Sequence, residues 1–173
     1  IPVGEEGKRY CFADDRYRNR ITETFPVDLA GHSPYGCSKL AADLYVQDYA
    51  CTHGLKTEVF RMSCVYGERQ FGVEDQGFLA HFVISAVLDK NITIYGTGKQ
   101  VRDVLHVEDL VRALDSALRR AESLPGEVYN IGGGVNNAVS LLEVIDYIER
   151  ISNKRIKLKF NEWRKADQKV YIK

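Results

Sequence analysis

The sequence predicts an α/β fold, in which helices and short strands alternate along one chain. Two observations support this prediction. Several stretches place apolar side chains at the three- and four-residue spacing of an amphipathic helix. Between these stretches lie short runs rich in β-branched and aromatic residues, bounded by turn residues, as strands usually are. The 173 residues are enough for one domain with a sizeable core.

The first half of the chain predicts a loop, a helix, a strand and a second helix. Residues 1–32 are polar and rich in turn residues, so we expect a long surface loop. A helix should follow, because Ser33 suits its N-cap, Pro34 its first turn and Gly54 its C-terminal end. Residues 57–63 are typical of a buried strand, and residues 78–90 repeat an amphipathic helical pattern.

The second half continues the alternation. Residues 92–95 predict a strand, and the turn at Gly96 to Gly98 leads to a second strand over 101–105, which suggests a hairpin. Residues 107–122 predict a helix with acidic residues in its first turn. A strand over 128–131 comes next. The remaining elements are a helix that starts with a capping box at Ser140 to Glu143, a strand at 156–160 and the start of a strand at 170–172.

Composition excludes several classes of protein. The 24 basic and 24 acidic residues cancel, so no net charge favours nucleic acid or a membrane surface. No apolar run is long enough to span a bilayer, and we expect a cytoplasmic protein. The four cysteines form no Cys-x-x-Cys pair and have no histidine cluster beside them, which argues against a metal site.

Tyr35 and Lys39 are the strongest candidates for catalysis. They lie four residues apart on the predicted helix that begins after Ser33, and therefore on one face of it. A nearby ammonium favours the phenolate form of a tyrosine, and a phenolate can remove a proton near neutral pH. A Tyr-x-x-x-Lys pair alone is common by chance, so the surrounding motifs decide its meaning.

Those motifs resemble the extended short-chain dehydrogenase/reductase family, which contains the NAD-dependent nucleotide-sugar epimerases and dehydratases. The segments that carry the resemblance are His32 to Lys39, Phe60 to Gly67, Gly96 to Leu110, Tyr129 to Gly133 and Arg164 to Gln168. They occur in the family's order along most of the chain. The resemblance implies the last parallel strands of a Rossmann-like sheet, followed by a small α/β substrate-binding region.

The resemblance also implies a reaction and a cofactor. In this family the tyrosine takes the proton of a sugar hydroxyl while NAD accepts a hydride, which then returns to the opposite face of the sugar. By resemblance, Tyr35 and Lys39 would be catalytic and would also contact NAD. Phe60, Arg61 and Ser63 would lie near the nicotinamide.

The implied substrate is a nucleotide-diphosphate sugar, with a CDP-sugar favoured. Arg102 would clamp the diphosphate, because a guanidinium makes paired, charge-assisted bonds to phosphate oxygens; the alternative is a surface pair between Arg102 and Asp103. Arg164 is a second diphosphate candidate. Tyr95 could line the nucleobase pocket, and Arg69 and Gln70 could face the sugar.

The domain organisation follows from the same resemblance. Residues 1–67 would belong to the NAD-binding domain and residues 68–173 mostly to the substrate-binding region, with residues 101–131 returning to the sheet. The chain has no Gly-x-x-Gly-x-x-Gly fingerprint after a strand. We therefore expect it to be the C-terminal part of a longer enzyme, which the family resemblance implies is a homodimer or homotetramer.

Three alternatives stay open. The chain could belong to a 4,6-dehydratase or decarboxylase of the same family. It could be a non-enzymatic relative that kept the fold, although such relatives often lose the Tyr/Lys pair. This chain alone could also be inactive, because half of its NAD site would be missing.

Overall fold

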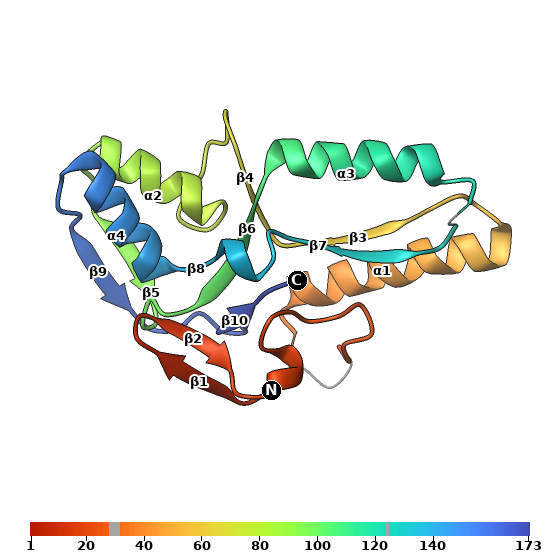
Figure 1. The fold of residues 1–173 in the computed structure, drawn as a ribbon, viewed down its shortest axis with the longest axis horizontal. Helices are drawn as coiled ribbons and strands as arrows, with labels where there is room; N and C mark the ends of the chain where they lie inside the picture. The colour runs from red at the N-terminus through yellow and green to blue at the C-terminus, as the bar shows by residue number, and fades with distance from the viewer. Residues whose placement is uncertain (28–31, 124) are drawn as a thin grey trace.

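The computed structural model describes residues 1–27, 32–123 and 125–173 (Figure 1). Its helices are α1 (Pro34–His53), α2 (Phe78–Val87), α3 (Val107–Arg120) and α4 (Leu141–Ser152). Its strands are β1 (Val3–Glu6), β2 (Arg9–Phe12), β3 (Val59–Met62), β4 (Cys64–Tyr66), β5 (Ile92–Tyr95), β6 (Val101–His106), β7 (Val128–Ile131), β8 (Ala138–Ser140), β9 (Leu158–Asn161) and β10 (Val170–Tyr171).

Strand β6 pairs with more neighbours than any other described strand. It runs parallel to β4 and β10 and antiparallel to β8. Two further parallel pairs join β3 to β7 and β5 to β9. Parallel pairs require long crossover connections, and helices supply them here. The predicted α/β class is therefore confirmed.

Figure 1 shows two groups of elements on either side of β6. At one end, α1 and α3 run along opposite sides of the β3–β7 pair. At the other end, α2 and α4 lie with β5 and β9 and enclose an apolar cluster that includes Phe82, Ile92 and Ile94. A second cluster, which includes Val101 and Ile172, joins β2, β6, β8 and β10.

The four predicted helices are all present, and their ends follow the local signals. The Ser33 side chain accepts a hydrogen bond from Gly36 N at 3.1 Å, and α1 ends at Gly54, which has a φ of 64°. The predicted capping box of α4 is confirmed: Ser140 Oγ accepts from Glu143 N at 3.1 Å, and the Glu143 carboxylate accepts from Ser140 N at 2.8 Å. Short capping motifs thus set two helix starts.

The first 27 residues differ from the predicted surface loop. β1 and β2 form an antiparallel hairpin, whose turn contains Gly7 with a φ of 58°. Tyr10 and Phe12 alternate onto one face of β2 and are 5% and 7% exposed in the core. The prediction was wrong because only two aromatic residues mark the strand, among charged neighbours. Residues 28–31 of the predicted loop lie outside the described residues.

The predicted hairpin over residues 92–105 is also wrong. Both strands exist, but β5 pairs in parallel with β9, and β6 pairs with β4, β8 and β10. Gly96 and Gly98 have φ values of 83° and 76° and redirect the chain between the two sheets. Trp163 packs so closely on Gly96 that an added Cβ would lie 2.5 Å from its ring. Tertiary contacts override the local turn signal here.

Replacing Ser140 with Ala should lower the free energy of unfolding by about 1 kcal/mol. Ser140 is fully buried, so Glu143 N would lose its acceptor where water cannot replace it. Urea unfolding measures the change. Ser152→Ala is the matched control at the other end of α4, because its hydroxyl bonds Ile148 O at an exposed site. Equal losses in the two variants would contradict the capping role.

Candidate active site

Tyr35 and Lys39 lie one turn apart at the start of α1, as predicted. Lys39 Nζ is 5.6 Å from the centre of the Tyr35 ring, which places both side chains on one face of the helix. Tyr35 is 70% exposed, and Lys39 is exposed as well. In the part of the chain that the structure describes, no hydrogen bond or ion pair engages the Lys39 ammonium. Both polar groups are therefore open to a ligand.

The three residues predicted near the nicotinamide have partners within the protein. The Phe60 ring stacks on Tyr129, with centroids 5.9 Å apart and planes at 22°. Arg61 donates to the Asp43 carboxylate and to Glu23 O. Ser63 Oγ donates to Asp103 O at 2.7 Å and also bonds the Asp103 carboxylate. A direct contact of these side chains with a cofactor stays a prediction.

Asp103 is a fully buried carboxylate that joins several segments. Besides Ser63, its Oδ2 accepts from Gly134 N and from Lys173 N, each at 3.1 Å. Burial raises the pKa of the nearby Tyr171 to about 12, and the Asp103 charge adds to that effect. Burial also lowers the pKa of Lys173 to about 8, which the Asp103 charge opposes. The alternative of an Arg102–Asp103 surface pair is therefore wrong.

Arg102 binds a different carboxylate. Its Nη2 lies 2.8 Å from Asp167 Oδ1, and the two side chains are 16% and 22% exposed. Its Nη1 donates to Val101 O at 2.8 Å. The buried Gln100 side chain lies against the same carboxylate, at 3.5 Å from Asp167 Oδ2. Arg102 is thus held in a defined position by an acidic partner and a backbone carbonyl.

Arg164 and Tyr95, both predicted to bind substrate, are brought together. The Arg164 guanidinium carbon lies 4.0 Å from the centre of the Tyr95 ring, a cation–π contact. Arg164 also pairs with Asp75 at 2.7 Å, while the Tyr95 hydroxyl donates to Glu74 Oε1 at 2.6 Å. These contacts join three segments that are far apart in sequence, around residues 74, 95 and 164.

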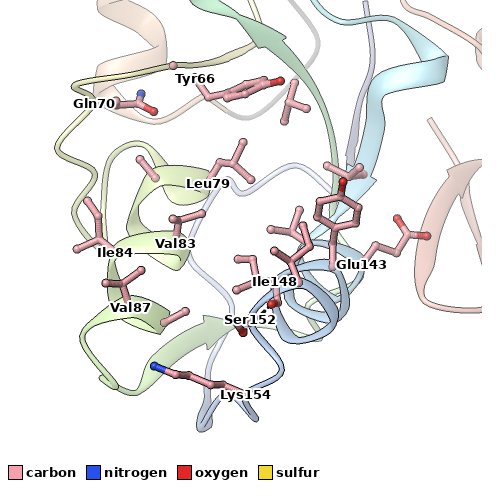
Figure 2. A pocket seen from close by; sticks show the side chains of 18 of the residues that line it. Tyr66, Gln70, Leu79, Val83, Ile84, Val87, Glu143, Ile148, Ser152 and Lys154 are labelled. Carbon is pink, nitrogen blue, oxygen red and sulfur yellow. Dashed lines mark hydrogen bonds between the residues drawn. The ribbon is translucent and has the colours of Figure 1, made fainter.

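Arg69 and Gln70 lie in the turn after β4, and Gln70 lines an apolar pocket. Arg69 has a φ of 64°, and Gln70 Nε2 donates to Val65 O at 3.1 Å. The pocket of about 910 Å³ lies between α2 and α4, with Tyr66 and Gln70 at one end and Lys154 at the other (Figure 2). Gln70 alone among the predicted site residues lines it. The other predicted residues lie outside this pocket.

Sequence reasoning missed two carboxylates, Asp43 and Asp103, that bind the predicted site residues Arg61 and Ser63 from outside the site. The Lys39-x-x-x-Asp43 spacing signals that Asp43 shares a helix face with Lys39. Alternation along β6 signals that Asp103 points away from the side on which Arg102 lies.

Among residues 1–27, 32–123 and 125–173, no cluster of three potential ligands could hold a metal ion. None of the helices described there has the length and apolar character that crossing a bilayer requires.

Comparison with known sequences gives the following relatives. Residues 11–132 match the family described as NAD dependent epimerase/dehydratase family. The chain is 45% identical to CDP-paratose 2-epimerase of Salmonella typhi over 97% of its own length and 50% of that protein. It is 36% identical to dTDP-glucose 4,6-dehydratase of Escherichia coli over 72% of its length and 32% of that enzyme. The chain thus spans about half, or less, of these curated relatives.

Solved structures show the same fold. UDP-glucuronic acid 4-epimerase from Bacillus cereus, in complex with UDP-glucuronic acid and NAD, matches with a TM-score of 0.77 and 30% identity, over 88% of this chain and 46% of that one. dTDP-glucose 4,6-dehydratase from Bacillus anthracis, in complex with NAD, matches with a TM-score of 0.75 and 34% identity, again over 88% and 46%. Both comparisons place this chain beside proteins that were crystallised with NAD.

Proposed function

Because this chain belongs to the NAD-dependent epimerase/dehydratase family, we propose that it is part of an epimerase that interconverts CDP-paratose and CDP-tyvelose at carbon 2 of the sugar. The exposed Tyr35–Lys39 pair is the observation that supports the reaction type. The 45% identity with CDP-paratose 2-epimerase, over 97% of the chain, supports the substrate.

The polar groups on α1 fit the ribose of a nicotinamide nucleotide. An exposed phenol and an exposed ammonium that is not engaged by the described part of the chain can both bond ribose hydroxyls. We propose that Tyr35 and Lys39 hold the cofactor in this way, with its nicotinamide near Phe60, Arg61 and Ser63 at the end of β3. NAD, when bound, supplies reversible acceptance of a hydride.

Residues of this chain carry out the proton transfer. Tyr35, as phenolate, removes the proton of a substrate hydroxyl and returns it when the hydroxyl is restored. The positive charge of Lys39 stabilises the phenolate form from one helical turn away. The protonation state of Tyr35 is the same before and after a turnover, because Tyr35 takes up one proton and returns one.

The substrate would be held by residues outside α1 and β3. Arg102 and Arg164 would bind the diphosphate, with Tyr95 beside the nucleobase and Arg69 and Gln70 facing the sugar. The support is that Arg164 and Tyr95 are in contact and that Arg102 is fixed on β6. Residues 1–67 would then serve the cofactor, and residues 68–173 mostly the substrate, with residues 101–131 returning to the cofactor side.

We further propose that two copies pair through α1. This helix has no buried residue, and its Leu44 and Tyr45 side chains are 58% and 67% exposed. Burial of such side chains against a twin helix would stabilise a dimer; a tetramer would need a second contact.

A nucleotide-sugar substrate and four free cysteines fit action in the cytoplasm.

Incubation of the full-length protein with CDP-paratose, followed by NMR, tests the activity. The expected product is CDP-tyvelose, and the reverse reaction should reach the same equilibrium ratio. A matched incubation with dTDP-glucose tests the dehydratase alternative, which similarity to the Escherichia coli dehydratase favours. Loss of water from dTDP-glucose, without interconversion of the CDP-sugars, would overturn the proposal in favour of that alternative.

A further inference from the structure

Lys39 has a second potential partner on its own helix. Asp43 follows it by four residues, so the two side chains share a face of α1. Opposite charges at this spacing attract each other. An ammonium bound to Asp43 would point away from Tyr35, which lies one turn in the opposite direction. The proposed chemistry therefore requires that something prevents this pair from forming.

Arg61 occupies the Asp43 carboxylate instead. Its Nε lies 2.6 Å from Asp43 Oδ2 and its Nη2 lies 3.3 Å from Asp43 Oδ1, a contact with both oxygens. The Gln47 amide adds a bond of 2.5 Å to Oδ1. The Asp43 and Arg61 side chains are only 10% and 25% exposed, so water screens their interaction little.

The rest of the Arg61 environment holds the guanidinium in place. Its Nη1 donates to Glu23 O at 2.8 Å, so the segment before α1 fixes the third corner of the group. With Asp43 bound in this way, the Lys39 ammonium lies over the Tyr35 ring, 5.6 Å from its centre, and not at the carboxylate. Because Arg61 binds Asp43, the Lys39 ammonium is available for its contact with Tyr35.

We propose that Arg61 is a positioning residue: by neutralising Asp43, it keeps the charge of Lys39 directed at Tyr35. This role rests on the proposed function and differs from a cofactor contact by the Arg61 side chain. Its effect passes through Asp43, so it should depend on whether Asp43 carries a charge. If Arg61 instead contacted the cofactor directly, the effect of replacing Arg61 would be the same whether or not Asp43 carries a charge.

Arg61→Met in the full-length protein should lower kcat by roughly 10- to 100-fold, with KM for the nucleotide sugar and the NAD content little changed. The free Asp43 carboxylate would then attract Lys39 and disfavour the phenolate. The double variant Arg61→Met/Asp43→Asn should recover kcat to within about threefold of Asp43→Asn alone, because the competing charge is gone. Asp43→Asn is the matched control and should stay close to wild type.

A second readout does not depend on turnover. Ultraviolet absorbance follows the ionisation of Tyr35 when the titration of a matched Tyr35→Phe protein is subtracted. The midpoint should move to higher pH in Arg61→Met and return in the double variant. The charged or titratable groups described near this end of α1 include Lys39 and Asp43 on the helix, Arg61 on β3, Arg20, Glu23 and His32 before the helix, Asp103 on β6 and Lys173 after β10.

Three outcomes would overturn the proposal. The first is a double variant that stays as slow as Arg61→Met. The second is loss of NAD from Arg61→Met that Asp43→Asn does not restore, which would indicate a cofactor contact. The third is a folded Arg61→Lys protein as slow as Arg61→Met, since lysine keeps the neutralising charge. Failure of the proposed function looks different, because wild-type protein would then not interconvert the CDP-sugars while the Tyr35 titration would still respond.

Discussion

Replacing Tyr35 with Phe is expected to lower kcat by about 10²- to 10⁴-fold, while NAD stays bound. Removing one oxygen atom abolishes the only proposed proton acceptor, and general base catalysis commonly contributes that much. The ring and its contact with Lys39 remain, so the helix and the fold should be unaffected. Steady-state kinetics on the full-length protein, with the NAD content read from absorbance, separates the two effects.

Tyr45→Phe is the control for this experiment. Tyr45 lies on the same helix and is 67% exposed, close to the 70% of Tyr35, but it is six residues from Lys39 and on another face of the helix. Its loss should leave kcat within about twofold of wild type. Turnover at the wild-type rate in Tyr35→Phe would remove Tyr35 from the mechanism.

Replacing Arg102 with Ala should weaken nucleotide-sugar binding by about 2–5 kcal/mol, or roughly 30- to 4,000-fold in Kd. The effect should be large because the Arg102 side chain is only 16% exposed, and a charge pair there is poorly screened. Arg102→Lys should fall between wild type and Arg102→Ala, since an ammonium cannot make paired bonds to the diphosphate. Isothermal titration with the nucleotide sugar measures both variants.

Arg112→Ala is the matched control for Arg102→Ala. Arg112 pairs with an aspartate, as Arg102 does, but its side chain is 68% exposed on α3. Its removal should leave Kd unchanged. A Kd for Arg102→Ala equal to that of wild type would show that Arg102 pairs with Asp167 but does not bind the nucleotide sugar.

Features set by neighbours in sequence were predictable. The start and end of α1, the capping box of α4 and the shared face of Tyr35 and Lys39 all follow from spacings of a few residues. The strands from Ile92 to Tyr95 and from Val128 to Ile131 were also found at their observed bounds. Each depends on side chains that lie within one element.

Features set by distant contacts were not predictable. The pairing of β5 with β9 joins residues more than sixty positions apart, and no local pattern selects it over a hairpin with β6. The Arg102–Asp167 and Arg61–Asp43 pairs depend in the same way on how separate elements pack. The β1–β2 hairpin was missed because the burial of Tyr10 and Phe12 comes from partners in the second half of the chain.

The alternation of Arg102 and Asp103 on β6 limits which changes to this strand the fold can accept. Sliding the strand by one residue would put a guanidinium in the solvent-free position of the carboxylate and turn the carboxylate outward. Asp103 also leaves no room for a side chain at position 132, because a Cβ on Gly132 would lie 2.0 Å from Asp103 Oδ2. An insertion or deletion within β6 should therefore destabilise the fold.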